Sequence, residues 1–158
     1  RSQIGLSWAN GQRILDIEDF IEGYRKTSLA KDEYLSKVSL CVPDSWHSFA
    51  FRKLSKRYED DISSVSIAIF LLHDDVCIKE IRIALGGVGE TALRVYGVEK
   101  MMRGGRFIDI DWGAIADALD ATISPISDVR ASADYRLNMA HVSIKEIVEQ
   151  FFLRSSGA

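Results

Sequence analysis

A lysine at the end of an aromatic stripe is the residue best placed for chemistry in this sequence. Phe49, Phe51 and Lys53 alternate along a strand-like segment, so their side chains should share one face. We expect that face to look inward and the Lys53 ammonium to border an open, ring-sized concavity. A buried ammonium needs a partner, which would be a carboxylate or a ligand oxygen. The alternative is that the strand ends there and the ammonium reaches into water.

A glycine-rich stretch, Gly86-Gly87-Val88-Gly89, follows another strand-like segment. Glycine lets backbone N–H groups approach an anion closely, so small-anion binding is one interpretation of this stretch. However, the stretch has neither the GxGxxG spacing nor a following Lys-Ser or Lys-Thr pair. The sequence therefore favours a tight turn that requires positive φ.

The histidines and cysteines predict no metal site. His73 lies beside Asp74 and Asp75 and offers at most weak metal binding, while a solvated hairpin tip fits the segment better. Cys41 and Cys77 form no CxxC pair, and we interpret them as small buried hydrophobes in a reducing compartment. The sequence also has no GxSxG or paired-carboxylate motif, so hydrolytic machinery is not visible.

Composition limits the function classes. The 158 residues are 47% hydrophobic and carry a net charge of −3, which argues against intrinsic disorder and against nucleic-acid binding through a basic surface. A globule of this size buries roughly 69% of its unfolded-chain surface, enough for one core and a small second lobe. No apolar run approaches the roughly 20 residues of a membrane helix. We see no signal peptide and expect a cytoplasmic protein without membrane contact.

Short strands around turns are predicted for the first part of the chain. A helix of one or two turns should start at Asp16 or Glu18 and stop at Gly23. Residues 24–33 show no regular spacing of apolar residues, so we predict a loop there. Strands are expected at residues 4–8, 13–17 and 38–42, with a hairpin at Asn10-Gly11 between the first two.

Pro43-Asp44-Ser45 is the strongest internal boundary, and we predict domains over residues 1–44 and 45–158. Three strands should follow it, connected by links too short for parallel crossovers, so we expect an antiparallel meander. These strands are predicted at residues 46–54, 62–72 and 76–85.

The last third of the chain is predicted to be helical. Asp111 can cap a short helix, and Ser127 or Asp128 should cap the longest one, whose apolar residues step by three and four from Val129 to Phe151. Strands followed by helices predict an α+β fold, in which the C-terminal helices cover one face of an antiparallel sheet.

Four segments resemble, in order and spacing, the flavin-binding portion of xanthine dehydrogenases. Residues 51–62 (FRKLSKRYEDDI) resemble an FxK…R…EDDI pattern, and residues 19–35 are similar to a DFFxGYRKT…DE-L stretch. Residues 84–88 (ALGGV) resemble an A-x-GG(V/M) turn. Residues 127–136 (SDVRASADYR) are similar to the SDxRASAxYR helix start of bacterial small subunits. Together the resemblance covers nearly the whole chain.

The resemblance implies the end of an FAD-binding domain followed by the C-terminal domain of the carbon monoxide dehydrogenase flavoprotein group, an α+β sandwich. Such enzymes hydroxylate a purine at a molybdenum centre and pass electrons through iron–sulfur clusters to FAD and then to NAD. Iron–sulfur clusters and molybdopterin would lie elsewhere in the complex. The implied partners are an N-terminal FAD and iron–sulfur segment and a molybdenum-binding subunit. We expect the isolated chain to be inactive and to bind FAD weakly or not at all.

The resemblance also implies three cofactor-binding residues, while the residue patterns themselves predict no metal ligand and no catalytic side chain. Leu35 would pack on the isoalloxazine ring, Lys53 would face its polar edge, and the charge of Asp60 would tune its redox behaviour. The arginine pair that often precedes EDDI in the family is Arg57-Tyr58 here, so a switch-like role of the second arginine is not carried over to this chain.

A different class of function is also open: a non-catalytic interaction or assembly module without flavin. Ala131, Ala133 and Ala140 would then give a helix face that packs closely against a partner. Self-association into a homo-oligomer through an apolar patch is compatible with either interpretation.

Overall fold

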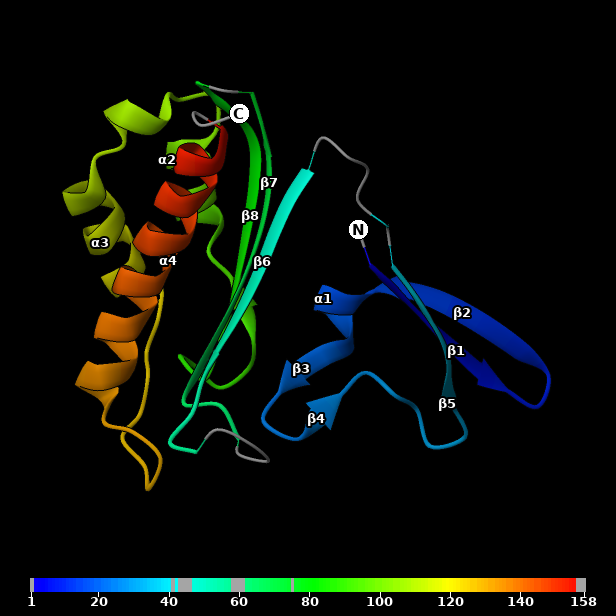
Figure 1. Cartoon of the computed structure of the whole chain (residues 1–158). Coiled ribbons are helices and arrows are strands. Elements are labelled where there is room, and N and C mark those ends of the chain that lie inside the picture. Colours follow the sequence, from blue (N-terminus) through cyan, green and yellow to red (C-terminus); the bar gives the residue numbers. More distant parts are fainter. Residues whose placement is uncertain (1, 41, 43–46, 58–61, 75, 156–158) are drawn as a thin grey trace. The chain divides into compact units, whose positions relative to one another are not determined.

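The computed structural model describes residues 2–40, 42, 47–57, 62–74 and 76–155. The chain divides into two compact units, Arg1–Asp44 (unit 1) and Ser45–Ala158 (unit 2). Each unit has sheets of its own (Figure 1).

A small antiparallel sheet forms most of unit 1. Its strands are β1 (Gln3–Trp8), β2 (Gly11–Asp16) and β5 (Tyr34–Ser39), in the order β2-β1-β5. The β1–β2 hairpin turns at Ala9-Asn10, which confirms the predicted hairpin. Among the described residues of this unit, the only buried hydrophobic side chains are Ile4 and Leu6 of β1.

The predicted loop over residues 24–33 is partly wrong. The one-turn helix α1 (Ile17–Phe20) leads into β3 (Ile21–Gly23), which pairs with β4 (Lys26–Thr27). Arg25 in the connecting turn has a φ of 55°. A left-handed residue closes the tight hairpin, while the two strands are too short for any alternation to show in the sequence.

Unit 2 contains a four-stranded antiparallel sheet. Its strands run in sequence order: β6 (His47–Leu54), β7 (Val65–His73), β8 (Ile78–Gly86) and β9 (Leu93–Arg94). The first three confirm the predicted meander. The short strand β9 was not predicted.

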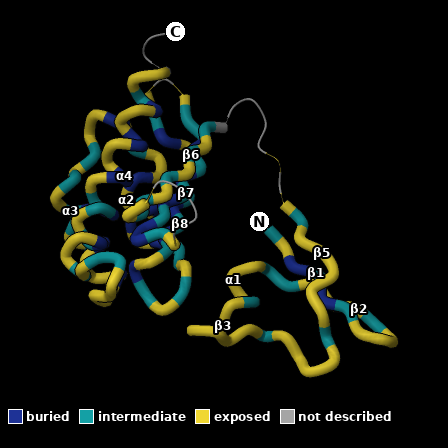
Figure 2. Tube along the Cα trace, turned by 60° about the horizontal axis from the view of Figure 1, so that its bottom comes forward, coloured by how far each residue is buried: buried dark blue, intermediate teal, exposed yellow. Residues whose placement is uncertain are grey.

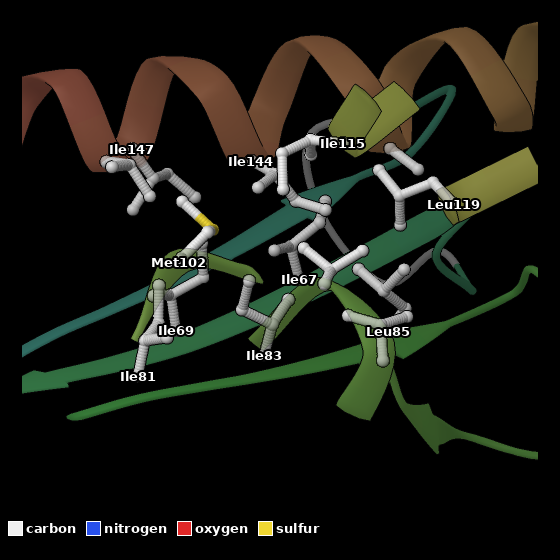
Figure 3. Close-up of a cluster of buried hydrophobic side chains, with 14 of the residues drawn as sticks. Ile67, Ile69, Ile81, Ile83, Leu85, Met102, Ile115, Leu119, Ile144 and Ile147 are labelled. Carbon is white, nitrogen blue, oxygen red and sulfur yellow. The ribbon is translucent and has the colours of Figure 1, made fainter. Parts of the chain in front are cut away.

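Helices cover one face of this sheet (Figure 1). They are α2 (Tyr96–Met102), the 3-10 helix η1 (Phe107–Asp109), α3 (Trp112–Asp120) and α4 (Ala133–Ser155). The close-up in Figure 3 shows branched side chains of β7 and β8, such as Ile67 and Ile83, facing Ile144 of α4, with Met102 filling space beside them. The α+β fold is confirmed. Alternation on the strands gives the sheet one aliphatic face, and the helices bury it.

The longest helix starts later than predicted. Asp128 accepts hydrogen bonds from the N–H groups of Arg130 (2.8 Å) and Ala131 (3.1 Å) and so makes a turn before the helix. The predicted apolar position Val129 therefore lies outside α4 and is 85% exposed. Ser127 still contributes, because its Oγ accepts from the N–H of Ala133, the first residue of α4 (2.9 Å).

Two further expectations about helices have opposite outcomes. Asp111 caps α3 as predicted and accepts from the N–H groups of Gly113 and Ala114. The prediction that Ala140 lies on a helix face that packs against a partner is wrong, because Ala140 is fully buried in the core of unit 2.

Buried residues are concentrated in unit 2, as Figure 2 shows. No helix among the described residues is long and apolar enough to cross a membrane.

Candidate functional site

The aromatic stripe lies on the sheet face opposite the helices. Arg52 of β6 forms an ion pair with Glu146 of α4 (Nη1–Oε2, 2.5 Å), so the side chain of Arg52 lies on the helix side. Its neighbours Phe51 and Lys53 must then lie on the other side. Phe49 and Phe51 are 60% and 61% exposed, and Lys53 is exposed as well. The expectation of an inward-looking stripe is wrong for this unit, because the helices cover the aliphatic face of the sheet.

Small residues continue from Lys53 across the open face. In the register of the sheet, Lys53 lies opposite Ser66 and Ser66 opposite Gly86. The next row on this face runs from Phe51 through Ala68 to Ala84. We call this strip, formed by Phe51, Lys53, Ser66, Ala68, Ala84 and Gly86, the open shelf. Its central side chains are short, and it is bordered by the aromatic ring of Phe51 and the ammonium group of Lys53.

The other end of the open face is occupied by larger side chains. Phe49 lies opposite Phe70, and the guanidinium of Arg82 lies 5.2 Å from the centre of the Phe70 ring. No ion pair joins Lys53 to another described residue, so its ammonium can donate to a ligand.

The three predicted cofactor residues are placed differently. Lys53 lies on the open shelf of unit 2. Leu35 belongs to unit 1, where it is 45% exposed on β5 and pairs with Leu6 of β1. Asp60 lies outside the described residues. So does Tyr58, which stands where the family often has a second arginine.

Gly87 makes the turn that the glycine-rich stretch predicts. Its φ is 78°, and a Cβ at this position would lie 2.3 Å from the carbonyl oxygen of Ser64. The glycine-rich stretch also forms a backbone hydrogen bond to another segment of unit 2, because the carbonyl of Val88 accepts from the N–H of Ser124 (2.9 Å). The tight-turn interpretation is confirmed.

Sequence reasoning missed Arg136, a buried cation on α4 that is 4% exposed. Its guanidinium donates to the carbonyls of Gly87 (3.0 Å) and Ser64 and pairs with Asp128 (Nη2–Oδ1, 2.7 Å). The apolar period of α4 gives no sign of it. The available signal was the SDVRASADYR segment, which contains both partners of the ion pair.

Hydrogen bonding stabilises the charged form of Asp128. The backbone N–H of Arg130, with further bonds from Ala131 and Arg136, holds the pKa of Asp128 well below its usual range, although partial burial opposes the shift. These bonds therefore favour the charged form of Asp128, which neutralises part of the surrounding positive charge.

Two hollows in unit 2 are lined by described residues, and Lys53 lines neither of these two. One, of about 220 Å³, is lined by Ser48, Phe49, Phe151 and Arg154. The other, of about 360 Å³, lies where β6 ends and α4 begins and is lined by Ser55, Lys56, Ser64, Arg130, Ala131, Ser132 and Tyr135. A ligand at Lys53 would rest on the open shelf and need a cover from elsewhere.

The histidine and cysteine predictions are partly corrected. His73 is the last residue of β7 and half-buried; its Nε2 lies 3.0 Å from Ser48 Oγ and its ring meets Phe107 edge-on. Cys77 is a free thiol that is only partly buried, and Cys41 lies outside the described residues. Within the described part of the chain, no group of three or more histidine, cysteine or acidic residues is arranged to hold a metal ion.

Comparison with known proteins identifies the family. Residues 50–151 match the family profile described as the CO dehydrogenase flavoprotein C-terminal domain. The chain belongs to this family. The resemblance to flavoprotein subunits of molybdenum hydroxylases, first seen in four short segments, is thereby confirmed.

Relatives of this family match most of the chain. The carbon monoxide dehydrogenase medium chain of Hydrogenophaga pseudoflava is 30% identical over 149 residues, which cover 94% of this chain and 52% of that protein. The xanthine dehydrogenase FAD-binding subunit of Escherichia coli O157:H7 is 26% identical over 148 residues, covering 93% and 51%. This chain thus spans about half the length of these relatives.

A solved structure agrees with the family assignment. Carbon monoxide dehydrogenase from H. pseudoflava, in a form lacking the Mo-pyranopterin moiety of its cofactor, matches with a TM-score of 0.84 and 28% sequence identity. The match covers 92% of this chain and 50% of that one.

Proposed function

We propose that this chain is part of the flavoprotein subunit of a xanthine dehydrogenase-like molybdenum hydroxylase of the cytoplasm and forms one wall of its FAD site. The observation that carries the proposal is the family match over residues 50–151, which contains the exposed ammonium of Lys53. FAD, when bound, would take electrons from iron–sulfur clusters and pass them to NAD. A molybdenum-binding subunit and an FAD and iron–sulfur segment would be the partners.

The open shelf fits one part of a flavin ring system. Its row of small residues, Ser66 and Gly86 beside Lys53, lets a flat group approach the sheet. The Lys53 ammonium can donate to carbonyl oxygens at the polar edge of the ring, and Phe51 offers an apolar border. No described set of residues on the open shelf provides a cradle for the pyrophosphate.

Leu35 and Asp60 are the other two residues of this chain that we propose to lie at the flavin ring. The half-exposed Leu35 side chain offers an apolar surface that would exclude water from one ring face. The carboxylate of Asp60 would set the local charge and oppose the effect of Lys53 on the ring.

FAD should bind weakly to the chain alone. Charge-assisted hydrogen bonds contribute about 1.5–3 kcal/mol each, and the open shelf lacks those that a pyrophosphate would receive. Titration of FAD with the chain, followed by flavin fluorescence, should give weak or no quenching. A sub-micromolar dissociation constant would contradict the proposal that this chain supplies only one wall.

Assembly with the remaining half of the subunit tests the function itself. Coexpression with a polypeptide covering the other half of the relatives' length should yield a yellow, flavin-loaded complex. Addition of the molybdenum-binding subunit should give NADH formation with a purine substrate. A colourless complex would favour the non-catalytic module.

The role of Lys53 can be measured in that flavin-loaded complex. Lys53→Met removes a positive charge that stabilises the reduced, anionic ring, so the flavin potential should fall by on the order of 30 mV, about 1.4 kcal/mol for two electrons. Lys100→Met, at an exposed lysine of α2, is the matched control and should leave the potential unchanged. Equal potentials in both variants would remove Lys53 from the site.

A further inference from the structure

The larger of the two hollows described above is lined by groups suited to an anion. It has a volume of about 360 Å³ and lies at the junction of three segments: the residues after β6, the residue before β7 and the start of α4. Its described lining contains two cations, Lys56 and Arg130, and no carboxylate. Four hydroxyl-bearing residues, Ser55, Ser64, Ser132 and Tyr135, complete the polar lining.

Both cations are held in place and retain free donors. The Nζ of Lys56 donates to the carbonyl of Val129 (2.7 Å), which leaves two of its three N–H groups for a ligand. Arg130 Nη1 lies 3.2 Å from Asp128 Oδ2. This contact involves only one nitrogen of a guanidinium group that has five N–H donors. Anchored cations lose less side-chain entropy on binding than free ones do.

One carboxylate, that of Asp128, is shared by two guanidinium groups beside this hollow. These two groups belong to Arg130 and Arg136. The Nε of buried Arg136, which bonds the carbonyl of the lining residue Ser64 through Nη1, has no hydrogen-bond partner within the described ranges.

We propose that this hollow binds a small phosphate-bearing molecule. Lys56 and Arg130 would contact the phosphate oxygens, because a guanidinium and an ammonium together match a tetrahedral dianion. The hydroxyl groups of Ser132 and Tyr135 can donate further hydrogen bonds, whereas that of Ser55 already donates to the carbonyl of Arg57 (2.7 Å). The volume accommodates a phosphate together with a small organic group, which favours a metabolite over an extended polyanion. The proposal does not depend on the flavin assignment.

Calorimetric titration of the 158-residue chain with inorganic pyrophosphate tests the site, at ionic strength held constant with chloride. Wild type should bind, and Lys56→Gln and Arg130→Gln should each raise the dissociation constant about tenfold, since each removes a hydrogen bond to a charged group. Lys100→Gln and Arg103→Gln, at exposed positions in and after α2, are the charge-matched controls and should bind as wild type does.

Two outcomes would overturn the site. One is the absence of measurable binding to wild type at millimolar pyrophosphate. The other is an equal loss of affinity in the control variants, which would mean that only net charge matters. Circular dichroism and the melting temperature of each variant without ligand separate lost binding from lost folding.

Discussion

Gly87 and Gly104 both have positive φ, 78° and 79°, but differ in what surrounds them. A Cβ at Gly87 would lie 2.3 Å from the carbonyl oxygen of Ser64 and 3.1 Å from Nη1 of Arg136. A Cβ at Gly104 would meet nothing within 4 Å. At Gly87 a side chain is therefore opposed by backbone conformation and by steric contact, while at Gly104 only the conformation opposes it.

We expect Gly87→Ala to lower the free energy of unfolding by about 3 kcal/mol, the sum of left-handed strain and overpacking. Gly104→Ala should cost about 1 kcal/mol, from the left-handed conformation alone. Urea denaturation followed by circular dichroism measures both. Equal losses in the two variants would show that the contact with Ser64 is relieved without cost.

Lys53 illustrates how far a residue pattern reaches. Strand alternation correctly placed Phe49, Phe51 and Lys53 on one face. It could not say which face the helices cover, because an aromatic stripe and an aliphatic stripe are both apolar. The aliphatic residues of β7 and β8 are buried in the core, and the aromatic stripe is exposed.

At the scale of elements, Glu99 attaches α2 to the sheet. This carboxylate is 1% exposed; Oε1 accepts from the N–H of Ile83 in β8 (2.8 Å) and from Arg94 of β9 (Nε, 3.0 Å). Arg94 also lies over the ring of Tyr96, 4.5 Å from its centre. One buried ion pair thus joins two strands and a helix.

Glu99→Ala should lower the free energy of unfolding by about 3 kcal/mol, because it leaves the Ile83 N–H without its acceptor and removes the carboxylate that pairs with the largely buried guanidinium of Arg94. Glu149→Ala, at an exposed site on α4, is the control and should change stability by less than about 0.5 kcal/mol. Thermal or urea unfolding of both variants is the measurement. A loss at Glu99 as small as at Glu149 would contradict the role of the ion pair.

At the scale of the whole molecule, the two units have unequal cores. Unit 2 contains a contiguous cluster of buried side chains from its sheet and helices, whereas in the described part of unit 1 only Ile4 and Leu6 are buried hydrophobics. Unit 1 instead exposes large apolar side chains, among them Ile14, Tyr34 and Leu40. A three-stranded sheet with so small a core has little hydrophobic stabilisation.

We therefore expect the fragment of residues 45–158 to fold alone and to melt in one cooperative transition close to that of the full chain. The fragment of residues 1–44 should be unfolded alone. Circular dichroism melts of both fragments and of the full chain give the answer. A cooperative transition in the shorter fragment would show that unit 1 has stabilisation not visible in its burial.

The sequence by itself determined the antiparallel meander, the C-terminal helices, the positive-φ turn and the family. These follow from local periods, caps and motif order, which depend on neighbours in the chain. Only the tertiary structure decided which sheet face is covered, where α4 begins and that Arg136 is buried against Asp128, Ser64 and Gly87. Those features depend on contacts between residues distant in sequence, and no local period records them.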